Sequence, residues 1–217
     1  MSAGESPRSS AVRGAHRYDV VKRALDLVAG CSGLVLTAPL QLGIAAVLLV
    51  VQGRPVFFRQ PRPGRDGAVF EIVKFRTMRG SEGTDLTGEQ RITRVGGFLR
   101  ATSLDELPTL WNVVRGDMSL VGPRPLRVEY LPLYSPQQAR RHEVRPGITG
   151  LAQVSGRNLL SWEERFALDV EYVDHRSPAL DARILALTIP KVFAREGISP
   201  EGSAIAESFR GTPTSDG

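Results

Sequence analysis

The sequence predicts an α+β protein that is mainly helical and that carries one membrane helix near its N-terminus. Three observations lead to this prediction: an uncharged apolar run, two strand-like segments joined by turn residues, and apolar residues at helical spacing through the remaining chain. The 217 residues are enough for one folded domain. The expected divisions are a disordered tail over 1–17, a membrane helix over 18–53, a cytoplasmic domain over 54–202 and a C-terminal tail over 203–217.

The membrane helix is predicted from the run Leu27 to Val51, whose 25 residues carry no charge. At about 1.5 Å per residue this run is long enough to cross a bilayer, and it is too long for the core of a signal peptide. Pro39 lies near its middle, and a proline removes a helix hydrogen bond and bends or breaks the helix.

Both flanks of this run are basic, although the positive-inside rule places basic flanks in the cytoplasm. A spanning helix would export one flank, whereas a helix that enters the membrane, breaks at Pro39 and returns keeps both flanks inside. The residues alone leave both forms open. The basic residues are Arg13, Arg17, Lys22 and Arg23 before the run, and Arg54, Arg59, Arg62 and Arg65 after it.

After the membrane helix, residues 55–59 and 69–75 are predicted to form a small β-hairpin, because the segment between them is rich in proline and glycine. A polar loop is expected over 80–90, and a short helix is expected to begin over 96–100. A further helix is predicted from apolar residues at helical spacing, namely Leu104, Leu107, Leu110, Trp111 and Val114.

Two later segments also have helical patterns. Ser161 to Glu164 is a capping-box sequence that opens one helix. Leu180 to Ala194 forms the other, which is apolar enough to lie on a membrane surface and is interrupted by Pro190. Amphipathic helices at the membrane interface are therefore expected in the second half of the chain.

Composition narrows the function classes. The net charge of +5 and the pI of about 9.9 suit nucleic acid, anionic lipid or a phosphorylated substrate. The single cysteine, Cys31, excludes an internal disulfide and a cysteine zinc site. The chain contains neither a dinucleotide-binding GxGxxG run nor a P-loop, which argues against a Rossmann enzyme and a P-loop NTPase.

Two adjacent carboxylates, Asp105 and Glu106, are the first candidate site. Ser103 and Glu106 have the spacing of a capping box, so a purely structural role is one interpretation. The other interpretation is chemical, because a carboxylate pair can supply a nucleophile and a metal ligand, and a helix N-terminus can hold phosphate.

The second candidate is Arg124, which lies between Pro123 and Pro125. The segment is either a rigid turn with a solvated arginine or a preset guanidinium that binds a phosphate through two parallel bonds. Arg100 lies five residues before Asp105 and could reach the same site.

These segments resemble the bacterial sugar transferases, specifically the small monotopic phosphoglycosyl transferases, over roughly residues 18–210. Residues 129–134 are most similar to the transferase that begins bacterial N-glycan assembly with diacetylbacillosamine phosphate. The motifs that carry the resemblance are Lys22-Arg23, Lys74-Phe75-Arg76-Thr77-Met78, Asp105-Glu106, Gly122-Pro123-Arg124-Pro125, Arg145-Pro146-Gly147-Ile148-Thr149-Gly150 and Gln153-Val154-Ser155-Gly156-Arg157-Asn158.

The resemblance implies transfer of a sugar phosphate from a UDP-sugar to polyprenyl phosphate, with release of UMP, at the cytoplasmic face of the bacterial plasma membrane. It also favours the re-entrant form of the membrane helix over 18–53, broken at Pro39. It implies that Asp105 is the nucleophile of a ping-pong mechanism and that Glu106 holds Mg²⁺. Arg157 would contact the nucleotide or sugar phosphate. Asp181 aligns with an acidic residue that is functionally important in the family. Lys74 and Arg76 have no assigned step.

Three residues depart from the family pattern: Ala38 stands where serine is common before the proline, Leu151 where tryptophan is common, and Ser155 where asparagine is common. The last two leave the identity of the sugar open. Two alternatives remain. One is a membrane-tethered protein that binds nucleic acid or anionic lipid, but the sequence contains no recognised nucleic-acid-binding motif to support it. The other is a glycosyltransferase that would release the nucleoside diphosphate instead of UMP.

Overall fold

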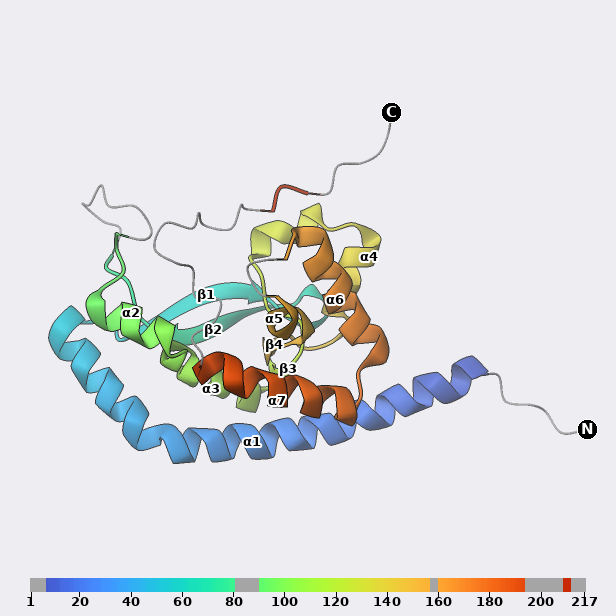
Figure 1. The fold of residues 1–217 in the computed structure, drawn as a ribbon, viewed down its shortest axis with the longest axis horizontal. Coiled ribbons are helices and arrows are strands. Elements are labelled where there is room, and N and C mark those ends of the chain that lie inside the picture. The colour runs from blue at the N-terminus through green and yellow to red at the C-terminus, as the bar shows by residue number, and fades with distance from the viewer. Residues whose placement is uncertain (1–6, 81–89, 157–159, 194–208, 212–217) are drawn as a thin grey trace, which may run out of the picture.

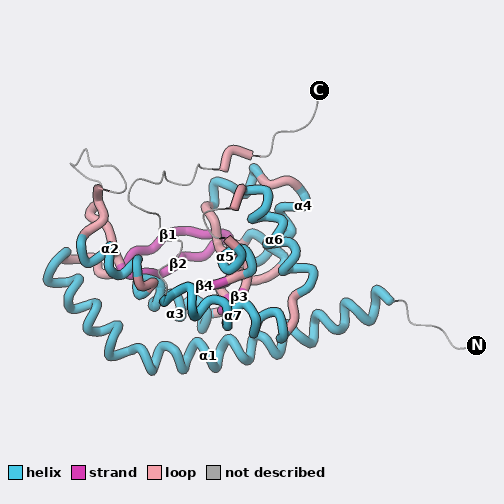
Figure 2. Tube along the Cα trace, in the orientation of Figure 1, coloured by secondary structure: helices cyan, strands magenta, loops and turns pink. Residues whose placement is uncertain are grey.

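The computed structural model describes residues 7–80, 90–156, 160–193 and 209–211. One long helix, α1 (Pro7–Gln52), runs along one side of the protein, and the remaining elements pack as a single body against it (Figure 1). Most of that body is helical, with short strands at its centre (Figure 2). The mainly helical α+β class predicted from the sequence is confirmed.

Helix α1 is bent, and it continues through Pro39 as one helix (Figure 1). Thr37 donates a hydrogen bond to the carbonyl of Gly33 at 2.6 Å, and Gln41 donates to the Thr37 hydroxyl at 2.8 Å. A threonine hydroxyl that bonds to the carbonyl four residues earlier bends a helix. Thr37 makes this contact, which its neighbour Ala38 has no hydroxyl to make. The sequence-based prediction of a break is thus replaced by a bend.

The helix begins earlier than the sequence predicts. Residues 7–17 are helical, whereas a disordered tail is expected there. Pro7 suits the first position of a helix, where its missing N–H has no partner to lose. From Tyr18 to Gln52 the helix is long and apolar enough to cross a membrane, and only 11% of its most apolar window is buried by the protein.

The first half of α1 is tied to the body by buried polar contacts. Arg23 donates to the carbonyls of Val113 and Val114 at 2.6 and 2.9 Å, which caps the C-terminus of α3 (Leu110–Arg115). Asp26 is 4% exposed and accepts from the amide of Leu120 at 3.1 Å. A side chain at Gly30 would lie 3.2 Å from Val114, so the two helices approach closely there.

The predicted hairpin is confirmed. Strand β1 (Phe57–Pro63) pairs antiparallel with β2 (Val69–Phe75) in a register that sets Phe57 opposite Phe75. A short 3₁₀ turn, η1 (Arg65–Gly67), joins them. β1 runs past the expected end at residue 59, because its prolines lie on an edge strand where a missing N–H is tolerated.

A second pair of strands was not expected. β3 (Ser119–Val121) lies parallel to β4 (Gly147–Thr149), and each strand is only three residues long. Two further bonds extend the pairing: the Gly122 amide donates to Thr149 at 2.9 Å, and the Gly147 amide donates to Pro123 at 3.0 Å. Strands this short have too little alternation to stand out in a sequence.

The other predicted helices are present with small changes in their bounds, but the helix predicted over residues 104–114 is a 3₁₀ segment over 104–109 followed by the short helix α3. The Ser161–Glu164 capping box is formed, and the C-terminal helix passes through Pro190 without interruption. The helices are α2 (Arg94–Ala101), α4 (Pro136–Ala139), α5 (Leu151–Ser155), α6 (Trp162–His175) and α7 (Pro178–Phe193), with 3₁₀ segments η2 (Leu104–Thr109), η3 (Val128–Leu133) and η4 (Arg140–Glu143).

The buried apolar residues connect these elements to one another. Leu48 of α1 packs with Phe75 of the hairpin and Leu99 of α2, and all three are at most 2% exposed. Phe209 is also buried, at 4% exposed, although residues 203–217 were expected to be a disordered tail. Its ring lies among other aromatic rings, and burying that much apolar surface explains why this residue is ordered.

Adjacent glycines in α2 provide a test of this packing. A Cβ at Gly96 would lie 1.9 Å from the carbonyl oxygen of Thr77, whereas at Gly97 the nearest atom, on Ile92, is 3.9 Å away. We expect Gly96→Ala to destabilise the protein by about 2 kcal/mol, or roughly 4–8 °C in Tm, because α2 must shift away from a backbone group. Gly97→Ala should leave Tm unchanged or raise it slightly. Thermal unfolding of both variants in detergent checks this, and equal effects would contradict it.

Candidate active site

The segment that carries the two carboxylates is bound to the free edge of strand β2. Asn112 is fully buried; it donates to the carbonyl of Glu71 at 2.7 Å and accepts from the amide of Val73 at 3.0 Å. Thr109 donates to the carbonyl of Val73 at 2.9 Å. Because these bonds satisfy backbone groups of an edge strand, η2 and α3 are held in one register against the hairpin.

Glu106 does not form the capping box that its spacing allows. Ser103 has a left-handed backbone (φ 56°), and its side chain accepts no bond from the following turn. Glu106 instead contacts two cations: Lys74 of β2 donates to its Oε1 at 2.5 Å, and Arg124 donates to the same oxygen at 2.8 Å. The capping-box interpretation of Glu106 is therefore wrong. Glu106 instead forms a charged cluster with Lys74 and Arg124.

The charges of this cluster shift one another's ionisation. Burial disfavours the charged form of Glu106, but Arg124 and Lys74 outweigh it and hold the pKa of this carboxyl well below its usual range. Burial lowers the pKa of Lys74, and the Glu106 charge raises the pKa of Arg124. Glu106 is consequently ionised at neutral pH.

Asp105 differs from its neighbour in having no fixed partner. Among the residues that the structure describes, none forms a hydrogen bond or an ion pair with its carboxylate. Burial, followed by the charge of Glu106, raises the pKa of Asp105 above its ordinary value. The charges of Lys74, Arg100 and Arg124 act in the opposite sense. An unpaired carboxylate within reach of three cations is suited to nucleophilic attack on an anionic phosphate ester.

The backbone carbonyl of Arg124 is held by the buried ion pair between Arg141 and Asp169. Arg141 donates to the carbonyl of Arg124 at 2.7 Å and, through two nitrogens, to one oxygen of Asp169 at 2.7 and 3.0 Å. The side chains of Arg141 and Asp169 are each 2% exposed. Sequence reasoning missed both residues, since they lie 28 positions apart within otherwise ordinary helical patterns.

Arg100 and Pro123 lie near the carboxylates but contact other groups. Arg100 of α2 donates to the Thr77 hydroxyl at 2.9 Å and reaches the Met78 sulfur at 3.1 Å. Its charge acts on Asp105 without a direct bond. Pro123 belongs to the loop over residues 122–125 that carries Arg124, which we call the arginine loop, and its carbonyl accepts from the Gly147 amide.

Two of the remaining candidates lie elsewhere. Asp181 of α7 pairs with Lys22 of α1 and accepts from the Tyr172 hydroxyl at 2.8 Å, so its observed contacts join helices. Arg76 donates to the carbonyl of Gly53 at 2.8 Å and so caps the end of α1. Arg157 lies outside the described residues.

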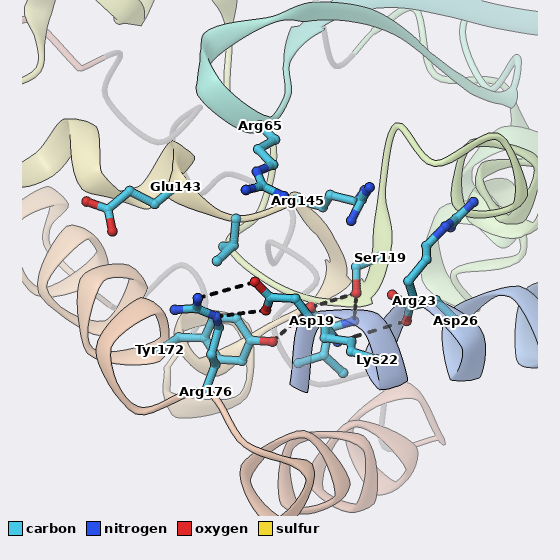
Figure 3. A pocket seen from close by; sticks show the side chains of 12 residues that line it. Asp19, Lys22, Arg23, Asp26, Arg65, Ser119, Glu143, Arg145, Tyr172 and Arg176 are labelled. Atoms are coloured by element: carbon cyan, nitrogen blue, oxygen red, sulfur yellow. Dashed lines mark hydrogen bonds and ion pairs between the residues drawn. The ribbon is translucent and has the colours of Figure 1, made fainter. Parts of the chain in front are cut away.

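The charged cluster borders a hollow between the hairpin and the β3–β4 pair. Besides Lys74, Glu106 and Arg124, its walls include Arg62 of β1, whose pKa is lowered by burial and by the neighbouring arginines. A second hollow lies where α1 meets α6 (Figure 3). Its acids are already paired, for example Asp19 with Arg176 at 3.1 Å, so its contacts fasten α1 to the body.

The donor set at the carboxylates fits Mg²⁺. No group of three or more His, Cys, Asp or Glu side chains occurs within the described ranges that could bind a metal without help from substrate. Mg²⁺ is commonly held by one or two carboxylates plus substrate phosphates and water. Both cations contact Oε1 of Glu106, which leaves Oε2 as the oxygen of this carboxylate that would hold the ion.

Comparison with known proteins gives consistent matches. The sequence model of the family described as bacterial sugar transferase matches residues 17–195. The uncharacterized sugar transferase EpsL of Bacillus subtilis (strain 168) is 52% identical over 196 residues, which is 89% of this chain and 97% of that protein. The exopolysaccharide production protein ExoY of Rhizobium meliloti (strain 1021) is 39% identical over 198 residues, 82% of this chain and 88% of that protein.

A relative with a more specific name is the UDP-glucose:undecaprenyl-phosphate glucose-1-phosphate transferase of Caulobacter vibrioides. It is 43% identical over 191 residues, which is 82% of this chain and 72% of that protein. The family match over 17–195 includes the carboxylate pair, Lys74 and Arg124. On these grounds the chain belongs to the bacterial sugar transferase family.

Proposed function

We propose that this protein transfers a sugar-1-phosphate from a UDP-sugar to a polyprenyl phosphate and releases UMP. The observation that carries the proposal is the carboxylate pair, in which Lys74 and Arg124 fix Glu106 while Asp105 has no described partner. Relatives named for UDP-glucose and undecaprenyl phosphate support this donor and acceptor class.

In the first step, a carboxylate oxygen of Asp105 attacks the phosphorus that bears the sugar. The new bond joins that oxygen to phosphorus, and the bond from phosphorus to the bridging oxygen of UMP breaks. In the second step, an oxygen of polyprenyl phosphate attacks the same phosphorus and the aspartyl bond breaks. The products are the polyprenyl diphosphate sugar and a restored Asp105 carboxylate, which is a ping-pong sequence.

The neighbouring residues have separate tasks in these steps. Arg124 has a side chain that is 47% exposed, so its remaining donors can bind the donor phosphates while Nη2 stays on Glu106. Lys74 adds a second positive charge beside the reacting carboxylate. Glu106 would hold Mg²⁺, which would supply charge neutralisation at the donor phosphates.

We further propose that α1 enters the cytoplasmic leaflet of the bacterial inner membrane and returns to the same side. The bend in α1, its exposed apolar surface and its basic flanks support this arrangement. Exposed apolar residues on the other helices, such as Phe98, Trp111 and Ile189, would rest at the interface. The reaction would then begin the assembly of a glycan such as an exopolysaccharide on its lipid carrier.

The test of the mechanism is a covalent adduct on Asp105. Incubation with a UDP-sugar and Mg²⁺ in the absence of lipid should leave a sugar phosphate on the protein, detectable by intact mass spectrometry and placed on Asp105 by peptide mapping. UDP-glucose and UDP-galactose are the first donors to try, since relatives are named for them. Asp105→Asn should give no adduct and almost no UMP, because an amide of the same shape is a poor nucleophile. An adduct on another residue would overturn the assignment.

The role of Arg124 can be separated from general charge effects by comparison with Arg127. Both side chains are exposed, but only Arg124 contacts Glu106. Arg124→Ala should lower the rate of UMP release by about 10² or more, because it removes a preorganised donor from an electrostatic site. Arg127→Ala should change the rate less than threefold. Similar small effects for both arginines would mean that the segment is only a turn.

The membrane arrangement predicts that both sides of the apolar run lie in the cytoplasm. Single cysteines at Ser10 and Gln137, each in a Cys31→Ser background, should both resist an impermeant thiol reagent in intact spheroplasts and both react after lysis. Pro39→Ala should straighten α1, so that some molecules expose position 10 outside. Labelling of position 10 from outside in the parent protein would instead indicate a spanning helix.

A further inference from the structure

Phe209 is the centre of an aromatic cluster that lies behind the arginine loop. Its side chain is 4% exposed, and the described rings that it contacts lie far earlier in the sequence, between residues 130 and 166. Its ring centroid lies 5.0 Å from Phe166, 5.5 Å from Trp162, 5.7 Å from Tyr130 and 5.8 Å from Tyr134, with edge, tilted and stacked geometries. Rings at these separations attract one another beyond simple burial.

The cluster is continuous with the buried arginine that supports the active site. The guanidinium of Arg141 lies 5.7 Å from the ring centre of Phe166 and 5.8 Å from that of Tyr134. These are two of the rings that Phe209 contacts. Because a planar guanidinium stacks on aromatic faces, the rings set the plane in which Arg141 can donate its hydrogen bonds.

Arg141 in turn contacts the backbone of the arginine loop. It donates to the carbonyl of Arg124 at 2.7 Å, and the Arg124 side chain contacts Glu106 at 2.8 Å. Leu126, two residues after Arg124, belongs to the same buried cluster as Phe209. Phe209 therefore contacts two rings that lie against Arg141, the group that holds the Arg124 carbonyl, and it shares a buried cluster with Leu126.

We propose that Phe209 is a positioning residue for Arg124, through which the C-terminal part of the chain sets the geometry of the active site. The proposal rests on the function proposed above, and it adds a residue that contacts neither substrate nor the reacting carboxylate. Removal of the ring leaves a cavity beside Tyr134 and Phe166, so Arg141 can tilt and the Arg124 carbonyl loses its fixed donor. A guanidinium displaced by about 1 Å is poorly placed for a phosphate.

The experiment measures UMP release by the full-length protein with a UDP-sugar, Mg²⁺ and undecaprenyl phosphate. Phe209→Ala should lower kcat by about tenfold or more. Phe209→Tyr, which keeps the ring, should restore it to within about twofold. Arg210→Ala is the matched control, since Arg210 is the next residue and is exposed, and it should behave as the parent. Parental turnover in Phe209→Ala would overturn the proposal.

A double-mutant cycle distinguishes positioning from a general loss of stability. In an Arg124→Ala background, Phe209→Ala should lower turnover by less than twofold, because the group that it positions is already absent. A further tenfold loss in that background would show that Phe209 acts by another route and would overturn the proposal.

A second readout does not depend on turnover. Amide hydrogen exchange measured by mass spectrometry should be faster over 122–127 in Phe209→Ala than in Arg210→Ala, with unchanged exchange in the hairpin over 69–75. Equal exchange over 122–127 in the two variants would overturn the proposal. If the parent protein releases no UMP from any UDP-sugar, the proposed function fails while this measurement still decides the role of Phe209. If Phe209→Ala does not fold, Phe209→Leu takes its place in all three measurements, with the same direction expected.

Discussion

Three separate parts of the chain meet at one oxygen atom, Oε1 of Glu106, and the rest of the candidate site depends on that contact. Lys74 comes from the hairpin, Glu106 from the 3₁₀ segment η2, and Arg124 from the loop after β3. Removing such charges from water is unfavourable, and a partly buried ion cluster of this kind is weak evidence of added stability. Its value lies in geometry: Glu106 is held by two fixed partners, whereas its neighbour Asp105 has no partner among the described residues.

The elements that surround this contact each satisfy a specific backbone requirement. Asn112 and Thr109 occupy the open edge of β2, so that the strand carrying Lys74 cannot slide relative to η2. The short β3–β4 pair fixes the start of the arginine loop through the Gly122 amide. The Arg141–Asp169 pair fixes the loop at the Arg124 carbonyl. The loop is therefore held at both ends by buried hydrogen bonds, which is the kind of support that a precise site requires.

Much of this could be predicted from local sequence patterns. The hairpin, the capped helix α6, the long apolar helix and the candidate residues Asp105, Glu106 and Arg124 each leave a signal within a few consecutive residues. What could not be predicted depends on long-range contacts. Nothing in the sequence near Glu106 distinguishes a capping box from a contact with Lys74, 32 positions away. Arg141, Asp169 and Phe209 are likewise ordinary in their own segments and become meaningful only when α6, η4 and the C-terminal residues come together.

The contact among Leu48, Phe75 and Leu99 places an apolar helix and the active-site strand in one rigid unit. Phe75 directly follows Lys74, and Leu48 lies in the apolar run, so a single buried cluster connects the long apolar helix with the lysine that contacts Glu106. Interiors packed in this way resist compression and do not stretch. The height of the carboxylate pair above any apolar layer that α1 enters is thus a fixed dimension of the protein. In the proposed reaction, a lipid acceptor would present its phosphate at that height, whatever the length of its hydrocarbon chain.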